Sequence, residues 1–240
     1  MGKHELIRLP GGGVLYDPEL LPPTEVEAFD PERPENRERV IATMSGRGQV
    51  QVLELNGLEV VLRHFRRGGL LGRLRDDTFV WTGLQRSRIF REWHLLRALH
   101  ERGLPVPRPV AARVLRRGLL YRGDIMTLRL PGTESLAQRL KIASLPESQW
   151  RTIGATLRRF HEAGAYHADL NAMNILMDTA GGCHVIDWDK GQLRNPRPRW
   201  QHANLRRLRR SLERLRERDS RLHFGEADWD ALMSGYRARP

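Results

Sequence analysis

Residues 167–189 constrain the fold of this chain more than any other segment, because polar residues flank two short apolar runs. The runs cover residues 175–178 and 184–186 and are separated by a glycine pair, a pattern that predicts the two strands of a hairpin. In such a hairpin Asn174, at the start of the first strand, lies beside Asp187, at the end of the second. The segment therefore predicts oxygen-bearing side chains gathered at one end of a small sheet.

The loop before this hairpin carries two more polar residues, His167 and Asp169. Amide and carboxylate oxygens are the hard ligands that suit Mg²⁺. Asn174 and Asp187 are therefore candidate metal ligands, and Asp189 is a candidate to assist them. Asp169 is a separate carboxylate that can accept a proton. We expect His167 to orient the backbone of this loop rather than to exchange a proton itself.

The spacing of these residues matches an arrangement used for phosphoryl transfer. His167, Asp169 and Asn174 keep the spacing H-x-D-x-x-x-x-N of a kinase catalytic loop. The strand that ends in Asp187 occupies the place of the D-F-G motif. The alternative is a capping Asp, a turn Asn and a strand-end Asp with no shared chemistry, which the combination of motifs disfavours. The segment therefore predicts a kinase that uses ATP and Mg²⁺.

A kinase also needs phosphate-binding groups in the first half of the chain. Gly46, Arg47 and Gly48 lie between two strand-like runs, where a loop over the ATP phosphates belongs; an ordinary tight turn is the alternative. Arg63 ends a strand-like run at the place of the lysine in V-A-I-K, and a guanidinium can pair two phosphate oxygens. Glu92, in a helical segment, is the candidate to hold Arg63; a solvated glutamate on a helix face is the alternative.

The apolar patterning divides the chain into a strand-rich first half and a helix-rich second half, which predicts an α+β fold with two lobes. We expect an irregular arm over residues 1–40, which are rich in Pro, Gly and acidic residues. The first lobe then spans residues 41–128, and a small helical lobe spans 129–240. The expected elements are a hairpin around Asn56-Gly57, a helix over 84–102, two strands within 111–130, and helices at 134–142, 146–164, 200–218 and 226–237.

The charge balance favours an anionic partner. The 240 residues include 41 Lys and Arg against 29 Asp and Glu, a formal net charge of +12. Such a charge suits nucleotides, nucleic acid or an anionic membrane surface. Aromatic residues make up 7% of the chain and mostly follow helix-core spacing, so we expect no base-stacking surface and no nucleic-acid partner.

Composition also limits the class of protein. Hydrophobic residues make up 40% of the chain, which excludes a wholly disordered protein. A single cysteine, Cys183, excludes a disulfide scaffold and a multi-cysteine metal site. The sequence has no run of about 18 apolar residues and no apolar stretch near its start. We therefore expect no transmembrane helix, no secretory signal and a location on the cytosolic side.

The arginine-rich segment 200–218 has two interpretations. Leu205, Leu208, Leu212 and Leu215 follow helical spacing, with arginines around them. On a membrane surface the leucines would enter the lipid interface and the arginines would contact phosphates. In the other interpretation the leucines pack into the second lobe, which we expect, while the arginine surface remains available to a membrane.

These motifs resemble the 3-deoxy-D-manno-octulosonic acid kinase (Kdo kinase) family of the protein-kinase-like superfamily, over roughly residues 45–236. The shared segments are GRG at 46–48, VLRHFRRGGLLGRL at 61–74, FREWHLL at 90–96, GLPVPRPVAAR at 103–113, HADLNAMNILMD from 167, VIDWDKG from 185, and the tail residues Trp200, Asn204, Leu205, Arg207, Leu208, Arg210, Ser211, Trp229, Leu232, Met233 and Tyr236. Met173 and Trp188 depart from the family pattern, which usually has His and Phe at these positions.

The resemblance implies a bilobal protein-kinase-like fold with Asp169 as the catalytic aspartate. Asn174 and Asp187 would hold magnesium, and Arg63 would take the lysine position. The implied reaction is ATP-dependent phosphorylation of the 4-hydroxyl of Kdo in a Kdo-lipid A precursor, a step of lipopolysaccharide inner-core biosynthesis. The implied location is peripheral, at the cytoplasmic face of the bacterial inner membrane. Three alternatives remain: a heptose kinase of the lipopolysaccharide core, a small atypical protein kinase or ATPase, and a non-catalytic nucleotide-binding module.

Overall fold

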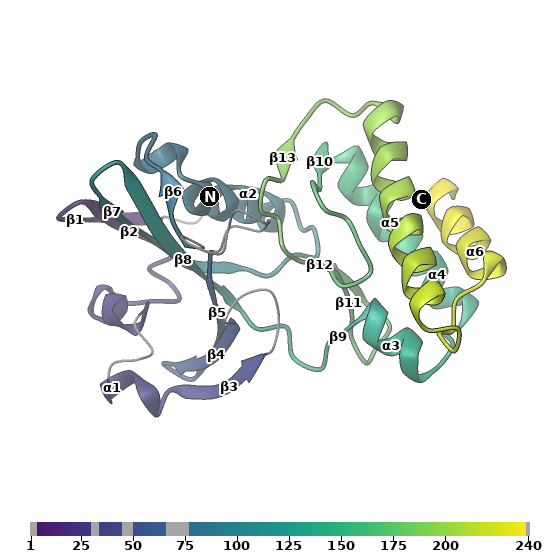
Figure 1. Ribbon diagram of the computed structural model, residues 1–240, viewed down its shortest axis with the longest axis horizontal. Helices are drawn as coiled ribbons and strands as arrows, with labels where there is room; N and C mark the ends of the chain where they lie inside the picture. Colours follow the sequence, from purple (N-terminus) through teal and green to yellow (C-terminus); the bar gives the residue numbers. More distant parts are fainter. Residues whose placement is uncertain (1–3, 30–33, 45–49, 66–76, 239–240) are drawn as a thin grey trace. The chain divides into compact units, whose positions relative to one another are not determined.

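The computed structural model describes residues 4–29, 34–44, 50–65 and 77–238. The chain divides into two compact units. Unit 1 comprises Met1–Arg97 and Arg108–Arg129, and unit 2 comprises Ala98–Pro107 and Leu130–Pro240. Unit 1 is rich in strands and unit 2 in helices (Figure 1), which confirms the predicted α+β fold class. The candidate phosphate loop, Gly46, Arg47 and Gly48, lies outside the described residues.

The described part of unit 1 is built around one antiparallel sheet of eight strands. Its order is β1–β2–β7–β8–β5–β4–β3, and β6 pairs with β8 beside this path. The strands are β1 Glu5–Leu9, β2 Gly12–Tyr16, β3 Val40–Met44, β4 Val50–Leu55, β5 Leu58–His64, β6 Phe79–Val80, β7 Pro109–Arg117 and β8 Leu120–Leu128. Two short helical turns, η1 Pro23–Phe29 and α1 Pro34–Arg37, lie between β2 and β3.

The hairpin predicted at Asn56-Gly57 joins β4 to β5 and is confirmed. Asn56 and Gly57 have positive φ angles of 52° and 75°, as a two-residue hairpin turn of this composition requires. Residues of β4 and β5 enter an apolar cluster shared with β2, β7 and β8, whose buried members are Val14, Tyr16, Leu21, Phe29, Leu53, Leu55, Val60, Leu62, Val110, Ala111 and Met126. Because Arg63 belongs to β5, this packing also fixes the backbone that carries it.

The prediction of an irregular arm over residues 1–40 is wrong for its first half. β1 and β2 form a hairpin, β2 pairs along β7, and Val14 and Tyr16 are buried. Glycines in this segment suggested a loop, but Gly12 instead allows β2 to approach β7 closely. A Cβ atom on Gly12 would lie 2.0 Å from the carbonyl oxygen of Val114, so only glycine fits at this point of the sheet.

The helix predicted over residues 84–102 is confirmed as α2, Arg88–Glu101, which follows the short 3-10 helix η3, Leu84–Arg86. The residues at the predicted helical spacing, Ile89, Trp93, Leu96 and Leu99, are all buried. Gly103 follows the helix with a φ of 66°, the left-handed conformation that commonly ends a helix.

Unit 2 contains the other predicted helices and two small antiparallel sheets. The helices are α3 Leu136–Ile142, α4 Glu147–Glu162, α5 Pro198–Arg218 and α6 Glu226–Arg237. The sheets are β12–β11–β9, formed by Cys183–Val185, Ile175–Met177 and Glu134–Ser135, and β10–β13, formed by Ala165–Tyr166 and Gln192–Leu193. The hairpin predicted after residue 174 is confirmed as β11 and β12. Within the described ranges, no helix has both the length and the apolar character needed to cross a bilayer.

Three of the four predicted leucines of α5 pack in the core of unit 2, and the fourth, Leu215, is partly buried. Leu205, Leu208 and Leu212 are 3%, 0% and 0% exposed, whereas Arg206 and Arg210 on the same helix are exposed. Burying the leucines removes their apolar surface from water without a membrane. The interpretation in which they enter a lipid interface is therefore wrong, and the expected core packing is confirmed.

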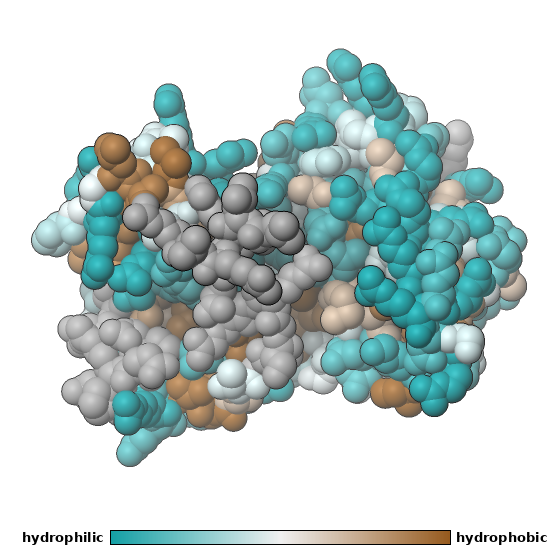
Figure 2. Space-filling view, viewed as in Figure 1, coloured by the Kyte–Doolittle hydropathy of each residue, from teal (hydrophilic) through white to brown (hydrophobic). Residues whose placement is uncertain are grey.

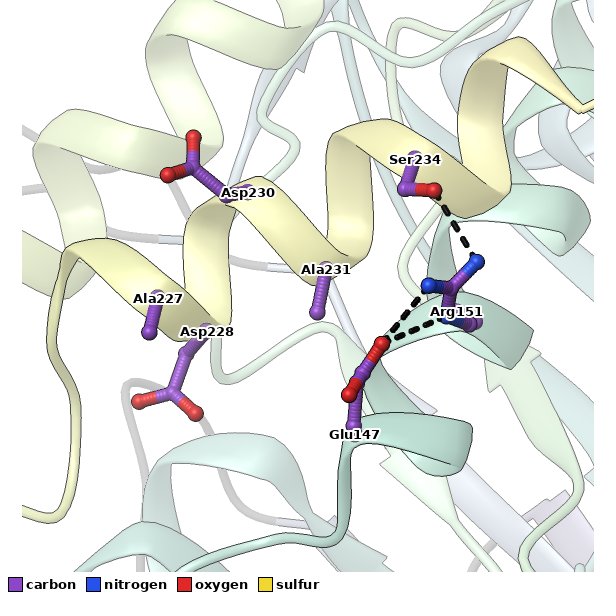
Figure 3. A pocket seen from close by; sticks show the side chains of 7 residues that line it. All are labelled: Glu147, Arg151, Ala227, Asp228, Asp230, Ala231 and Ser234. Atoms are coloured by element: carbon purple, nitrogen blue, oxygen red, sulfur yellow. Dashed lines mark hydrogen bonds and ion pairs between the residues drawn. The ribbon is translucent and has the colours of Figure 1, made fainter.

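Helices α4 and α6 make a close contact through two glycines. A Cβ atom on Gly154 would lie 2.0 Å from the carbonyl oxygen of Leu232, and one on Gly235 would lie 2.1 Å from that of Arg151. At the edge of this contact Arg151 donates a hydrogen bond of 3.0 Å to Ser234 Oγ (Figure 3). The two helices therefore pack backbone against backbone and leave no room for a methyl group.

Replacing Gly235 by Ala is expected to lower the free energy of unfolding by about 1–3 kcal/mol. Alanine improves helix propensity by up to about 1 kcal/mol, but the added methyl group meets a carbonyl that cannot rotate away, so overpacking dominates. Urea unfolding measures the difference. Gly225→Ala, just before the same helix, is the control, because Gly225 has an ordinary φ of -140° and the nearest atom to its Cβ position is 4.0 Å away. An unchanged or raised stability of Gly235→Ala would contradict the close contact.

His161, near the end of α4, is buried against α6. Its Nδ1 lies 2.8 Å from the hydroxyl oxygen of Tyr236, and burial lowers its pKa from 6.5 to about 4. Between these two values the unfolded chain binds more protons than the folded chain, so stability falls as pH falls. We expect acidification from pH 7 to pH 4 to lower the free energy of unfolding by about 3 kcal/mol through this group.

Urea unfolding across this pH range measures the effect of His161. In a His161→Gln variant the dependence on pH should be shallower by the same amount, because glutamine does not titrate. Equally steep dependences in the two proteins would show that His161 takes up its proton as readily in the folded chain as in the unfolded chain.

Candidate active site

His167 anchors the loop between β10 and β11 from the inside. It is 2% exposed, and burial lowers its pKa, so the imidazole is neutral near pH 7. Its Nε2 lies 3.0 Å from the carbonyl oxygen of Ile186 and its Nδ1 lies 3.1 Å from the backbone nitrogen of Asp169. A backbone N–H only donates and a carbonyl only accepts, so the proton is on Nε2. Both ring nitrogens are therefore occupied with holding backbone, which supports the orienting role expected for His167.

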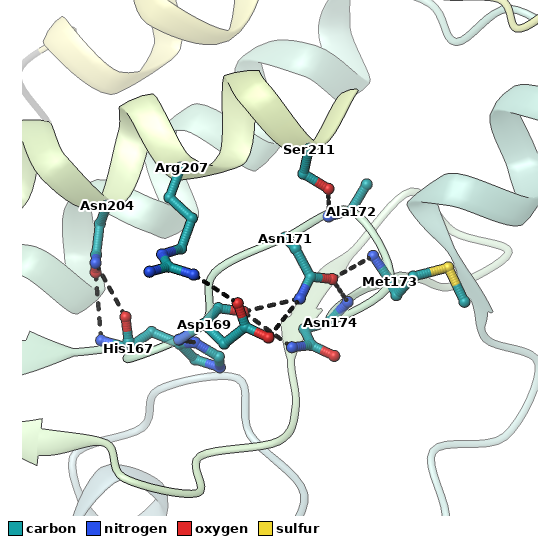
Figure 4. Close-up of polar contacts among 9 residues, drawn as sticks. All are labelled: His167, Asp169, Asn171, Ala172, Met173, Asn174, Asn204, Arg207 and Ser211. Atoms are coloured by element: carbon teal, nitrogen blue, oxygen red, sulfur yellow. Dashed lines mark hydrogen bonds and ion pairs between the residues drawn. The ribbon is translucent and has the colours of Figure 1, made fainter. Parts of the chain in front are cut away.

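Asp169 accepts hydrogen bonds at its backbone carbonyl and at both carboxylate oxygens, although its side chain is 58% exposed. Its backbone carbonyl accepts hydrogen bonds of 3.0 Å from the side-chain amides of Asn171 and Asn174. One carboxylate oxygen accepts from Arg207 Nη1 at 2.9 Å, and the other accepts from Asn171 Nδ2 at 3.3 Å (Figure 4). The sequence-predicted proton acceptor thus combines access to solvent with a restricted orientation.

Helix α5 supplies contacts to this loop that the sequence reasoning missed. Asn204 accepts a hydrogen bond from the backbone nitrogen of His167 and donates one of 2.9 Å to its carbonyl oxygen. Ser211 Oγ accepts from the backbone nitrogen of Ala172 at 3.2 Å (Figure 4). These two residues and Arg207 follow the spacing i, i+3, i+7, which places them on one face of a helix. In the sequence, the only sign of these contacts within α5 is the helical spacing of three polar residues beside the leucines.

Asn174 and Asp187 lie at the same end of the β11–β12 hairpin, as predicted. The backbone nitrogen of Ile186 donates a hydrogen bond of 3.0 Å to the carbonyl oxygen of Asn174, which places Asp187 one residue further on. Asn174 is 8% exposed and Asp187 is exposed. Asp187 has a φ of 61°, a left-handed conformation that Asp tolerates better than most residues.

Trp188 fixes the segment between the two predicted metal-ligand aspartates. It is 1% exposed, its Nε1 donates a hydrogen bond of 3.0 Å to the carbonyl oxygen of Val185, and its ring centroid lies 4.8 Å from that of His167. Asp187 and Asp189, on either side, are more exposed than this anchor. One buried indole thus separates two more exposed carboxylates along the chain.

The donor set at this end of the hairpin fits magnesium. The amide nitrogen of Asn174 already donates to the carbonyl oxygen of Asp169, which leaves its amide oxygen as the atom for a ligand. Mg²⁺ binds proteins through one or two carboxylates and completes its shell with water and phosphate oxygens. No cluster of three or more His, Cys, Asp or Glu suited to a metal ion occurs among the described residues.

Unit 1 brings the predicted pair Arg63 and Glu92 together. Arg63 Nη2 lies 2.5 Å from Glu92 Oε1, and the side chains are 27% and 2% exposed. The Arg63 guanidinium also lies 4.6 Å from the ring centroid of Phe65. Burial of Glu92 excludes a solvated glutamate on a helix face. A buried carboxylate needs its cation, so Glu92 holds Arg63 at the end of β5, as predicted.

A comparison with known protein families identifies the family to which the chain belongs. The sequence profile of the lipopolysaccharide kinase (Kdo/WaaP) family matches residues 32–236. The chain belongs to this family. It is therefore a phosphotransferase, as the spacing of His167, Asp169 and Asn174 predicted, and the resemblance stated from the sequence is confirmed.

Individual relatives are similar over most of their length. The chain is 43% identical over 205 residues to the "3-deoxy-D-manno-octulosonic acid kinase" of Stenotrophomonas maltophilia (strain K279a), covering 85% of this chain and 82% of that protein. Proteins of the same name from Xanthomonas campestris pv. campestris (strain B100) and from Photobacterium profundum are 41% identical over 225 residues and 38% identical over 224 residues. These matches cover 94% and 93% of this chain, and 89% and 94% of the two proteins.

Proposed function

We propose that this chain transfers the terminal phosphoryl group of ATP to a hydroxyl of the Kdo sugar in a Kdo-lipid A precursor, a step of lipopolysaccharide inner-core biosynthesis. The observation that carries the proposal is the geometry around Asp169. Its carboxylate is exposed to an incoming hydroxyl, yet both of its oxygens and its backbone are held. The relatives named as Kdo kinases give the acceptor.

Asp169 acts on the acceptor hydroxyl. It orients the hydroxyl by accepting its hydrogen bond and takes its proton late, because the phosphoryl group passes through a loose transition state that needs little base strength. The neutral imidazole of His167 keeps the loop in place and exchanges no proton. The incoming oxygen is thus positioned by a carboxylate that the fold already holds, which removes much of the entropy cost of reaching the transition state.

The negative charge of the ATP phosphates must be balanced by positive groups, and we propose that Arg63 and a bound Mg²⁺ supply them. Arg63, held by Glu92, supplies a guanidinium that can pair phosphate oxygens. Asn174 and Asp187, with Asp189 assisting, would hold Mg²⁺. Bound there, magnesium would neutralise charge on the phosphate oxygens.

Phosphate transfer from labelled ATP tests the proposed acceptor. We expect the enzyme to label a Kdo-bearing lipid A precursor and to leave the same precursor without Kdo unlabelled. NMR of the product would identify the 4-hydroxyl as the phosphorylated position. Labelling of heptose-bearing cores, of protein or of RNA in place of the Kdo lipid would refute the acceptor while retaining a kinase.

We also propose that the protein works peripherally at the cytoplasmic face of the inner membrane, because its acceptor is a lipid. An exposed apolar tip on unit 1 supports this proposal: Val80 is 61% exposed and Leu119 is 80% exposed. The backbone of Trp81 pairs with Leu119 at 2.9 Å, and Arg116 stacks on the Trp81 ring at 5.3 Å. Figure 2 shows hydrophobic residues gathered near β6. Apolar side chains, an indole and arginine together suit an anionic lipid surface.

Sedimentation with vesicles tests the apolar tip. Wild-type protein should bind vesicles that contain an anionic phospholipid more strongly than zwitterionic ones, and the double variant Val80→Ser, Leu119→Ser should bind several-fold more weakly. Ile142→Ser is the matched control, because Ile142 is 73% exposed but lies in unit 2. Equal binding by wild type and the double variant would exclude the tip as a membrane contact.

A further inference from the structure

One face of α5 forms a polar ladder against the catalytic loop. Its three members are Asn204, Arg207 and Ser211, and they contact His167, Asp169 and Ala172 respectively (Figure 4). The helix lies beyond the metal-site hairpin in sequence. Its buried leucines each follow a ladder residue by one position, which is about 100° around the helix, and they pack in the core of unit 2. The buried leucines fix the helix, and the fixed helix sets the position of the ladder.

Arg207 differs from the other two members because it reaches a side chain that reacts. Asn204 and Ser211 bond only backbone groups of the loop. Arg207 Nη1 instead lies 2.9 Å from the carboxylate oxygen Oδ1 of Asp169. The other carboxylate oxygen is held by Asn171. The two contacts oppose rotation of the carboxylate, which as an exposed side chain would otherwise sample several rotamers.

This ion pair contributes little to folding. Arg207 is 47% exposed and Asp169 is 58% exposed, and ion pairs with such access to water have small effects on stability. Removing Arg207 should therefore change the orientation of the Asp169 carboxylate and leave the stability of the fold nearly unchanged. A guanidinium here also adds a positive charge beside the position at which a negatively charged phosphoryl group must meet the acceptor.

We propose that Arg207 is a positioning residue for the reaction, which holds the carboxylate of Asp169 in the orientation that receives the acceptor hydroxyl. The role is distinct from those of Asn174, Asp187 and Arg63, which concern the phosphates and their cation. It rests on the proposed function, in which Asp169 accepts the hydroxyl proton. α5 thereby belongs to the active site as well as to the core.

Steady-state kinetics of three variants test the role of Arg207. In Arg207→Gln we expect kcat to fall by about 10–100-fold, with KM for ATP and the thermal midpoint close to those of wild type. Arg207→Lys should recover part of the loss, because lysine keeps the charge but not the fork of N–H donors. Arg206→Gln removes the same charge from the preceding residue of α5, which is exposed, and should leave kcat unchanged.

Chemical rescue separates positioning from a structural role. Adding guanidinium at millimolar concentration to Arg207→Ala should raise its kcat and leave Arg206→Ala unchanged. A kcat of Arg207→Gln equal to that of Arg206→Gln would overturn the proposal, as would a loss that follows the thermal midpoint and is not rescued.

A second measurement, the rate of ATP hydrolysis, tests the role of Arg207 whether or not the acceptor is the Kdo lipid. Slow hydrolysis of ATP by water also requires Asp169 to orient the attacking oxygen, so it is measured in the same variants. If wild type fails to label the Kdo lipid, the proposed acceptor fails. Arg207→Gln should still lower hydrolysis relative to Arg206→Gln, and equal hydrolysis by the two variants would refute the positioning role.

Discussion

Replacing Asp169 by Asn is expected to lower kcat for phosphoryl transfer by about 10³-fold, within the range that general acid–base groups contribute. Asparagine keeps the size of the side chain, and its amide oxygen can still accept from Arg207. It cannot take the proton of the acceptor hydroxyl, so the chemical step fails while the loop stays in place. Initial rates with labelled ATP measure kcat, and calorimetric titration with a nucleotide measures ATP binding, which should change by less than about threefold.

The control for this variant is Asp230→Asn, which removes a carboxylate from the exposed face of α6 and should retain full activity. A thermal midpoint of Asp169→Asn near that of wild type would show that the loss is chemical, because the carboxylate is 58% exposed and contributes little to folding. An Asp169→Asn enzyme that turns over at a rate near wild type would remove Asp169 from the mechanism.

The parts of the fold that the sequence predicted are those whose signals are local. The Asn56-Gly57 turn and the α4 helix each depend on residues within one hairpin or one helix, and both are present. The N-terminal hairpin was missed because its stability comes from β7, which lies far along the chain and pairs with β2. Its glycines are typical of loops by composition, whereas Gly12 is a packing residue that only the partner strand explains.

The candidate site divides in the same way. His167, Asp169 and Asn174 were found because one loop fixes their spacing, and the hairpin pairing placed Asp187 beside them. Arg207 comes from a helix 38 residues away in sequence, so its contact with Asp169 exists only once the leucines of α5 are buried. Spacing within α5 predicted those buried leucines and, by the same geometry, a polar face beside them. It did not predict which loop that face would meet.

Replacing Asp187 by Asn is expected to weaken Mg²⁺-dependent nucleotide binding at least about tenfold and to lower turnover about 10²–10³-fold. Removing the carboxylate leaves Asn174 and Asp189 as donors with one negative charge in place of two, so the divalent cation is held more weakly among the phosphate oxygens. Titration of Mg²⁺ against a fixed concentration of ATP measures the binding effect. Raising the Mg²⁺ concentration should recover part of the turnover.

Asparagine is the informative replacement because the backbone of Asp187 has a φ of 61°. Asn adopts this left-handed conformation readily, whereas alanine there costs about 1–2 kcal/mol, so Asp187→Ala would combine lost charge with backbone strain. Asp189→Asn is the matched control for charge and should have a much smaller effect, since Asp189 only assists. If Asp189→Asn instead lost more Mg²⁺ affinity than Asp187→Asn, the main ligand would lie after Trp188 rather than before it. The indole, anchored on Val185, would then separate the cation from Asn174, and the match to the D-F-G position would be wrong.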